Sequence, residues 1–276
     1  MSRIRPSLVL PALLATLTIM CGDDDGAHAR PSQGTPTRRA TVVRSATTPA
    51  FGVHILDRIP HDSAAFTQGL AFYAGRLYES TGLYGSSSLR RIDVHSGGAE
   101  TIVALPRTLF GEGIAILGDR LYQLTWKSEI ALVYDVATLT LRDTLRYRGQ
   151  GWGLTAYGDS LIMSDGTSRL RVLDPATFRV VRTLDVTDSV APVKSLNELE
   201  YIDGEIWANV WGSTWIARID PTSGRVRAWV DVSAVRRADP RASDQNVANG
   251  IAHDAASGRI FVTGKRWSWV YVVEAR

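Results

Sequence analysis

The sequence lacks the motifs of several common enzyme classes. Its single cysteine, Cys21, excludes an internal disulfide. It contains neither a GxSxG nucleophile elbow nor a phosphate-binding glycine loop. The histidines are scattered without the spacing of a zinc site, and we interpret each as a surface or turn residue: His28, His54, His61, His95 and His253. We therefore expect neither a metal nor another cofactor.

An excess of charge of one sign is also missing. The 276 residues have a formal net charge of +3. Residues 1–21 hold two arginines and no acids, so the rest of the chain has 29 basic and 28 acidic residues, a net charge of +1. A nearly neutral chain offers no electrostatic footprint for nucleic acid, and we expect no nucleic-acid partner.

A long uncharged run is found at the start of the chain. SLVLPALLATLTIM follows Arg3 and Arg5 and is too short for a comfortable membrane span, which predicts a signal peptide over residues 1–21. Cys21 leaves two alternatives open: a lipid-modified cysteine of the bacterial lipoprotein kind, or an ordinary signal peptide cleaved nearby. In both cases we expect export. The protein would then be periplasmic, secreted into the medium, or attached to a membrane only through the lipid anchor.

Residues 22–50 have almost nothing to bury. They are rich in Ser, Thr, Pro, Gly, Ala and Arg, which is typical of a flexible tether. We therefore place the folded domain at residues 51–276.

One sequence pattern recurs five times in this domain. The copies are FTQGLAFYAGRLYESTG, FGEGIAILGDRLYQLTW, GWGLTAYGDSLIMSDG, LNELEYIDGEIWANVW and ANGIAHDAASGRIFVTGK. Each predicts a β-hairpin, because two short apolar runs are joined by turn residues. A second pair of strand-like runs follows each of the first four hairpins, so the strands recur in groups of four.

The period of the repeat is that of propeller blades. Steps of 44, 40, 45 and 52 residues separate the equivalent positions Gly69, Gly113, Gly153, Glu198 and Gly250. One strand, WVYVVEA, follows the last hairpin, and an unassigned strand, FGVHILDRI, precedes the first. We predict an all-β fold, a five-bladed β-propeller with four antiparallel strands per blade, closed by pairing residues 51–59 into the last blade. A β-sandwich or a set of unrelated hairpins would not explain the constant period.

The first strand of a propeller blade is innermost, so the residue that opens it lies at one mouth of the central channel. These residues are Gln68, Glu112, Trp152, Asn197 and Asn249. The antiparallel second strand returns to the same mouth, which adds Gly82, Trp126, Gly166, Trp211 and Lys265. Phe66 and Phe110 lie two positions before the opening residue of the first two blades. We call these twelve residues the rim.

The composition of the rim is typical of a binding or catalytic site rather than of side chains that only fill the channel. Its residues differ from blade to blade, whereas the neighbouring scaffold position stays aliphatic at Leu70, Ile114, Leu154, Leu199 and Ile251. Aromatic walls raise the pKa of a carboxyl group, so Glu112 could exchange protons near neutral pH. Tryptophan faces also suit a cationic amine.

About ten ordered motifs make residues 51–276 similar to a known family. They are HDSAAFTQGL, YESTGLYGSSSLR, FGEGI, LYQLTWK, GWGL, SDGT, LNELEYIDGEIWANVW, ARID, NGIA and FVTGK. In this order they resemble the glutaminyl-peptide cyclotransferases (glutaminyl cyclases) of the plant and bacterial type. The resemblance implies a five-bladed propeller without metal, unlike the zinc-dependent animal enzymes of the same activity.

The resemblance also implies an aminoacyltransferase reaction. The α-amine of an N-terminal glutamine attacks its own side-chain carboxamide, which forms pyroglutamate and releases ammonia. The partners would be peptides or proteins with an N-terminal glutamine, and we expect a monomer. By matching motifs, the family's site residues fall on Phe66, Gln68, Phe110, Glu112, Trp126, Trp152, Asn197, Trp211 and Lys265. Asn249 is added by the repeat alone.

We expect Glu112 to act as general acid and base, with Gln68, Asn197 and Lys265 as the other catalytic residues. The aromatic rim residues and Asn249 would bind the substrate. Two roles stay open for Lys265, either to stabilise negative charge on the carbonyl oxygen or to lower the pKa of Glu112 by direct pairing. The alternative to an enzyme is a non-catalytic propeller that binds a peptide or small ligand at the channel mouth.

Overall fold

The structure is a computed structural model that describes residues 42–189 and 191–276. The predicted signal peptide, Cys21 and most of the predicted tether lie outside the described residues. None of the described helices is long and apolar enough to cross a membrane.

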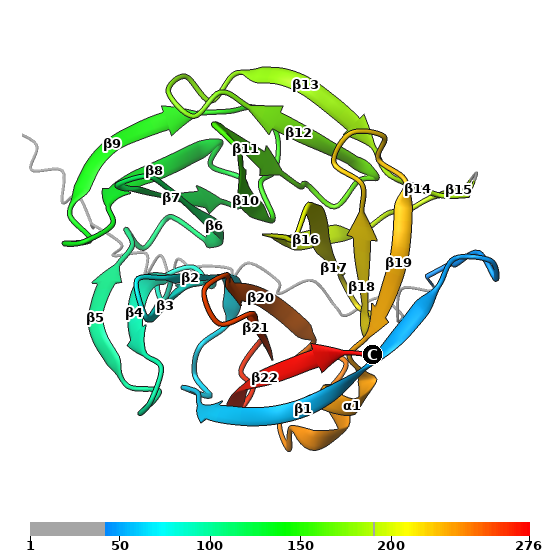
Figure 1. The fold of residues 1–276 in the computed structure, drawn as a ribbon. Helices are drawn as coiled ribbons and strands as arrows, with labels where there is room; N and C mark the ends of the chain where they lie inside the picture. Colours follow the sequence, from blue (N-terminus) through cyan, green and yellow to red (C-terminus); the bar gives the residue numbers. More distant parts are fainter. Residues whose placement is uncertain (1–41, 190) are drawn as a thin grey trace, which may run out of the picture. The chain divides into compact units, whose positions relative to one another are not determined.

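Three four-stranded antiparallel sheets follow one another along the chain (Figure 1). The first contains β2 (Thr67–Tyr73), β3 (Arg76–Thr81), β4 (Ser88–Asp93) and β5 (Ala99–Ala104). The second contains β6 (Gly111–Leu117), β7 (Arg120–Thr125), β8 (Ile130–Asp135) and β9 (Leu141–Arg146). The third contains β10 (Leu154–Tyr157), β11 (Ser160–Met163), β12 (Arg169–Leu173) and β13 (Val180–Asp185). Within each sheet the strands lie in sequence order.

An eight-stranded sheet contains the rest of the repeat. One half is β16 (Leu196–Ile202), β17 (Glu205–Val210), β18 (Trp215–Ile219) and β19 (Val226–Asp231). The other half is β20 (Ala248–Asp254), β21 (Arg259–Gly264), β22 (Trp269–Ala275) and β1 (Ala50–Pro60). A two-stranded sheet, β14 (Thr187–Asp188) and β15 (Ala191–Pro192), and one short helix, α1 (Ser233–Ala238), complete the described elements.

Strand β1 joins the two ends of the described chain. It begins parallel to β19 over Ala50–Gly52 and continues antiparallel to β22, from Val53 opposite Ala275 to Pro60 opposite Trp269. The predicted pairing with the last strand is therefore confirmed for residues 53–59, whereas residues 51 and 52 pair with β19.

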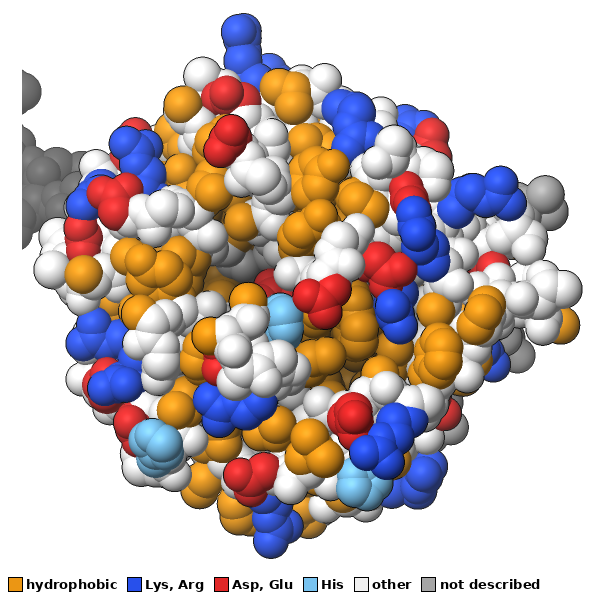
Figure 2. Space-filling view, in the orientation of Figure 1, with side chains coloured by type: hydrophobic (Ala, Val, Ile, Leu, Met, Phe, Trp, Pro, Cys, Tyr) orange, Lys and Arg blue, Asp and Glu red, His pale blue; other side chains and the backbone are white. Residues whose placement is uncertain are grey.

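The first strands of the hairpins surround a common centre. Strands β2, β6, β10, β16 and β20 contact one another in this order, and β20 contacts β2 (Figure 1). Figure 2 shows that the surface is hollowed at this centre. The buried apolar residues form five clusters, each between two neighbouring groups of four strands. The described unit is thus a propeller-like all-β fold with a lined centre.

Burial decreases from the inner to the outer strands, as the sequence of each strand requires. Inner strand β6 reads GEGIAIL and is buried over its first five residues. Outer strand β9 reads LRDTLR and is mostly exposed. The small and aliphatic residues of the inner strands permit the close packing that positions the rim.

The last residues of the predicted tether contact the eight-stranded sheet and β14. Asp188 accepts a hydrogen bond from the backbone N–H of Ser45 at 2.6 Å and another from the hydroxyl of Thr48. The Arg44 guanidinium lies 3.6 Å from the centre of the Trp215 ring. Residues 44–48 are therefore held against the sheet before β1 begins.

Candidate active site

Four of the five opening residues lie at irregularities of the inner strands. The register with the second strand shifts at Gln68, Glu112, Asn197 and Asn249. Such a bulge re-aims a side chain that would otherwise follow the strict alternation of a strand. The fifth residue, Trp152, precedes β10 by two positions. The irregular strand starts therefore allow adjacent, buried side chains to share one mouth of the channel.

The ends of the second strands lie beside the starts of the first, as predicted. The backbone N–H of Trp126 donates to the carbonyl oxygen of Phe110 at 3.0 Å, and that of Lys265 donates to Val247 at 3.0 Å. Equivalent bonds of 2.8 Å join Gly82 to Phe66 and Trp211 to Ser195. Residues 16 to 18 positions apart in sequence are thus neighbours at the rim.

Aromatic rings form two contact groups in the rim. The ring centres of Phe66 and Phe110 are 6.3 Å apart, and those of Phe110 and Trp126 are 5.5 Å apart. Trp152 and Trp211 form the second group, with ring centres 6.2 Å apart. Such pairs give a rigid apolar wall.

Two rim residues are glycines because neighbouring rings occupy the space of a side chain. A Cβ at Gly82 would lie 2.3 Å from the Phe110 ring. A Cβ at Gly166 would lie 2.7 Å from the Trp152 ring, and Gly166 also has φ of +82°. A larger residue at either position would displace part of the aromatic wall.

Two residues near the rim were missed by sequence reasoning. The amide oxygen of Gln150 accepts hydrogen bonds from the indole N–H groups of Trp126 at 2.8 Å and Trp152 at 3.0 Å, so it links the two aromatic groups. Gln150 lies two positions before Trp152, as Phe110 lies two positions before Glu112. This shared spacing in the repeat is a sequence signal that could have identified Gln150 as a rim neighbour. Tyr84, in the loop after β3, packs on Phe110 with ring centres 5.4 Å apart and had no signal in the repeat.

Glu112 and Lys265 are the buried charged pair of the rim. Burial raises the pKa of Glu112 well above its usual value, although the charge of Lys265 and a hydrogen bond from Gln68 act in the opposite direction. Burial lowers the pKa of Lys265 to about 8, although the Glu112 carboxylate acts to raise it. The Lys265 ammonium also lies 4.6 Å from the centre of the Phe66 ring. Burial therefore makes the Glu112 carboxylate a stronger proton acceptor, and the Lys265 ammonium a stronger proton donor, than the same groups in water.

Asn249 extends the polar part of the rim. Its side-chain amide donates to the carbonyl oxygen of Thr67 at 3.1 Å and to the amide oxygen of Gln68 at 3.3 Å. Its own amide oxygen is buried and has no hydrogen-bond partner in the described part of the chain. Asn197 is joined to the site through its backbone, whose oxygen accepts from the hydroxyl of Ser164 at 2.6 Å. The structure thus links Glu112, Gln68 and Asn249 by side chains and Asn197 by main chain.

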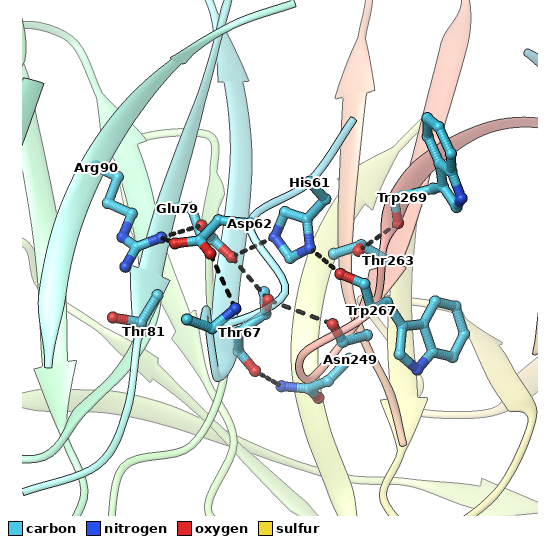
Figure 3. Close-up of polar contacts among 12 residues, drawn as sticks. His61, Asp62, Thr67, Glu79, Thr81, Arg90, Asn249, Thr263, Trp267 and Trp269 are labelled. Carbon is cyan, nitrogen blue, oxygen red and sulfur yellow. Dashed lines mark hydrogen bonds and ion pairs between the residues drawn. The ribbon is translucent and has the colours of Figure 1, made fainter. Parts of the chain in front are cut away.

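A buried ion pair lies behind Asn249, and Figure 3 shows its contacts. The Nε2–H group of His61 donates to the Glu79 carboxylate at 2.9 Å, and the Thr67 hydroxyl donates to the same oxygen at 2.7 Å. Burial alone would lower the pKa of His61, but the charge and hydrogen bond of Glu79, together with the Trp267 carbonyl and the charge of Asp62, raise it. Burial alone would raise the pKa of Glu79, but the charge and hydrogen bond of His61 lower it. The interpretation of His61 as a surface or turn residue is wrong, because its side chain is only 1% exposed.

Metal ligands are not grouped in the described residues. Across residues 42–189 and 191–276, no set of three or more His, Cys, Asp or Glu side chains is placed to hold a metal ion.

Comparison with known proteins decides the family. The family described as glutamine cyclotransferase matches residues 29–275. The chain belongs to the glutamine cyclotransferase family. The glutaminyl-peptide cyclotransferase of Arabidopsis thaliana is 42% identical to this cyclotransferase over 229 residues, which cover 81% of this chain and 71% of the relative. The crystal structure of Myxococcus xanthus glutaminyl cyclase is 37% identical, covers 83% of this chain and 98% of that chain, and superposes with a TM-score of 0.79.

Membership of the glutamine cyclotransferase family confirms the resemblance that the ordered motifs predict. The match covers nearly all described residues, so the rim of this cyclotransferase falls inside the family's own sequence.

Proposed function

We propose that this chain is an acyltransferase that converts the N-terminal glutamine of peptides and proteins to pyroglutamate and releases ammonia, with Glu112 as its proton-transfer group. The activity is that of the family. The observation that carries the role of Glu112 is its environment: the carboxyl group is 4% exposed, hydrogen bonded to Gln68 and near the Lys265 charge.

The proposed reaction conserves atoms and protons. The neutral α-amine attacks the carboxamide carbon of the same glutamine, forming the C–N bond of the five-membered ring. The Glu112 carboxylate takes a proton from the attacking nitrogen and passes it to the leaving nitrogen. The bond between the carbon and the leaving nitrogen then breaks, and ammonia departs. A carboxyl whose pKa is raised by burial suits this double role, because its carboxylate is a stronger proton acceptor than that of an ordinary glutamate.

The amides and the lysine would hold the carboxamide during this reaction. Lys265, with a pKa of about 8, is mostly protonated at neutral pH and would stabilise the carbonyl oxygen as it gains negative charge. Gln68 and Asn197 would orient the same group. The unpartnered oxygen of Asn249 is an acceptor for a substrate N–H. The aromatic wall would keep the short side chain in a cyclising geometry.

We also propose that the fold is a five-bladed propeller. The closed ring of inner strands and the five apolar clusters support this architecture, with β1 as the outer strand of the last blade. The eight-stranded sheet would then be two blades joined where β1 passes from β19 to β22.

For the N-terminal region we propose export. The mass of the mature protein would distinguish a cleaved signal peptide from a lipidated Cys21.

The proposed activity is tested with a Gln-initiated dipeptide by following ammonia release. We expect one ammonia per pyroglutamyl product, and the same rate after dialysis against a chelator, because the proposed chemistry uses only protein side chains. A dipeptide that starts with asparagine is the matched control, since its side chain would form a strained four-membered ring. A pure, folded protein that binds the glutamine dipeptide without releasing ammonia would instead support a binding platform.

Replacing Lys265 by Met should move the acid limb of the kcat/KM profile to higher pH. The positive charge of Lys265 lowers the pKa of Glu112, so its removal lets burial raise that pKa further. The carboxylate form needed to accept a proton then appears only at higher pH. Lys127→Met is the control, because Lys127 is an exposed cation 3.9 Å from the Trp126 ring centre. An acid limb that stays in place in Lys265→Met would contradict this electrostatic coupling.

A further inference from the structure

Glu198 differs in size and charge from the residues at the same position of the other inner strands. The equivalent position is glycine in the other four copies of the repeat: Gly69, Gly113, Gly153 and Gly250. At Gly113 a Cβ would lie 2.6 Å from the backbone nitrogen of Leu154, and at Gly153 it would lie 2.0 Å from the carbonyl oxygen of Asn197. The inner strands therefore approach so closely at this level that side chains are excluded. Glu198 nevertheless places a carboxyl group there, 1% exposed.

The Glu198 carboxyl bridges two neighbouring inner strands. One oxygen accepts the backbone N–H of Leu70 in β2 at 3.2 Å, and the other accepts the N–H of Ile251 in β20 at 2.9 Å. Glu198 itself belongs to β16. One side chain therefore connects three strands through two backbone donors.

These three strands are the ones that carry the rim amides. Leu70 lies two residues after Gln68, Ile251 lies two residues after Asn249, and Glu198 directly follows Asn197. In the described contacts no carboxyl ties β6, which carries Glu112, to these strands, and β10 is linked to β16 only further along the strand, where the hydroxyl of Thr155 donates to Glu200 at 3.5 Å. The bridge therefore acts on the amide side of the rim.

A carboxyl group is well suited to this bridge. Both of its oxygens accept hydrogen bonds, whether it is ionised or protonated. Burial raises the pKa of Glu198 well above its usual value, with the nearby Glu200 acting in the same direction and the two N–H donors acting against it. A glutamine of the same size would turn an NH2 group toward one of the two backbone donors and lose one bond of the bridge.

We infer that Glu198 is a positioning residue for the cyclisation site, which sets the separations of Gln68, Asn197 and Asn249 by bridging β2, β16 and β20. It does not touch the substrate. This inference rests on the proposed function in assigning the three amides to the substrate carboxamide. Its structural part, the positioning of the amides, does not depend on catalysis.

The test compares Glu198→Gln with Glu200→Gln. Glu200 lies two residues further along β16 and also accepts a backbone N–H of β20, from His253 at 3.0 Å. Both substitutions replace one buried acid by its amide and weaken one hydrogen bond between β16 and a neighbouring inner strand. We expect similar losses of thermal stability in both variants. Only Glu198→Gln should lower kcat/KM for the glutamine dipeptide, by at least about tenfold, whereas Glu200→Gln should stay within about twofold.

A second readout separates this inference from the proposed function. The side-chain amide NMR signals of Gln68, Asn197 and Asn249 should shift in Glu198→Gln and stay in place in Glu200→Gln, whether or not the parent is active. Glu198→Met, which removes the acceptors without adding a donor, provides the same comparison if the glutamine variant does not fold. Equal activities and unshifted amide signals in the Glu198 variants would overturn the positioning role, whereas an inactive parent with shifted signals would contradict only the proposed function.

Discussion

Glu112→Gln should lower turnover of a glutamine dipeptide by about a hundredfold or more while leaving the protein folded. The amide keeps the size of the side chain but can neither accept the proton of the attacking amine nor return it to the leaving nitrogen. Steady-state ammonia release gives the rate. Glu112→Asp is the comparison variant, because it keeps the carboxyl group but draws it back by one methylene, and it should retain part of the activity.

The stability of Glu112→Gln gives this result its control. Folding raises the pKa of Glu112 above its ordinary value of 4.5, so the folded state binds its proton more tightly than the unfolded state. The free energy of unfolding therefore falls as pH rises through the window between these two pKa values. Because the amide cannot ionise, Glu112→Gln should be at least as stable as the parent at pH 8, measured by urea unfolding. Near-normal turnover in a folded variant would remove Glu112 from the mechanism.

His61→Ala should destabilise the protein by about 3–5 kcal/mol, which is the usual effect of removing one member of a buried ion pair. Without His61, the fully buried Glu79 keeps the Thr67 hydroxyl, and the nearest remaining cation in the network is Arg90 at 3.9 Å. Urea unfolding at pH 6 measures the loss. Asp62→Ala is the matched control, because Asp62 pairs with the same Arg90 but is 54% exposed, and it should cost less than about 1 kcal/mol.

The difference in unfolding free energy between the parent and His61→Ala should decrease toward both low and high pH. The pKa of His61 is raised above 6.5, so its contribution is complete below that value and is lost as pH rises through the raised pKa. The pKa of Glu79 is lowered below 4.5, so its contribution is complete above that value and is lost as pH falls through the lowered pKa. The difference in unfolding free energy should therefore be largest between about pH 4.5 and 6.5. A flat difference across pH 4–8 would mean that the pair is not charged.

Repetition made much of the rim predictable from sequence. Equivalent positions of a repeated hairpin occupy equivalent places, so the opening residue Glu112 and the closing residue Trp126 can be assigned to one mouth from the sequence alone. The same regularity predicted the strand at residues 51–59 and its pairing with the end of the chain. It succeeded because hairpin register and strand order are properties of neighbouring residues.

Contacts between distant segments could not be predicted in this way. The burial of His61 depends on Glu79 and on the backbone of Trp267, which is 206 positions away. The raised pKa of Glu112 results from its burial in the folded ring, and it is opposed by the charge of Lys265, which follows a strand of a different sheet. Glu198 replaces the glycine of the other four aligned repeats, but its two backbone partners become neighbours only when the inner strands form a ring.

The pairing of β1 with β22 also determines when the enzyme can be completed during synthesis. Val53 and Ala275 are neighbours across these strands although more than 200 residues separate them, so β1 lacks this partner until β22 has been synthesised. Asn249 and Lys265 belong to the same late segment. A nascent chain that ends before β20 contains Glu112 but not Lys265. The proposed catalytic site is therefore complete only after the last strands have been synthesised.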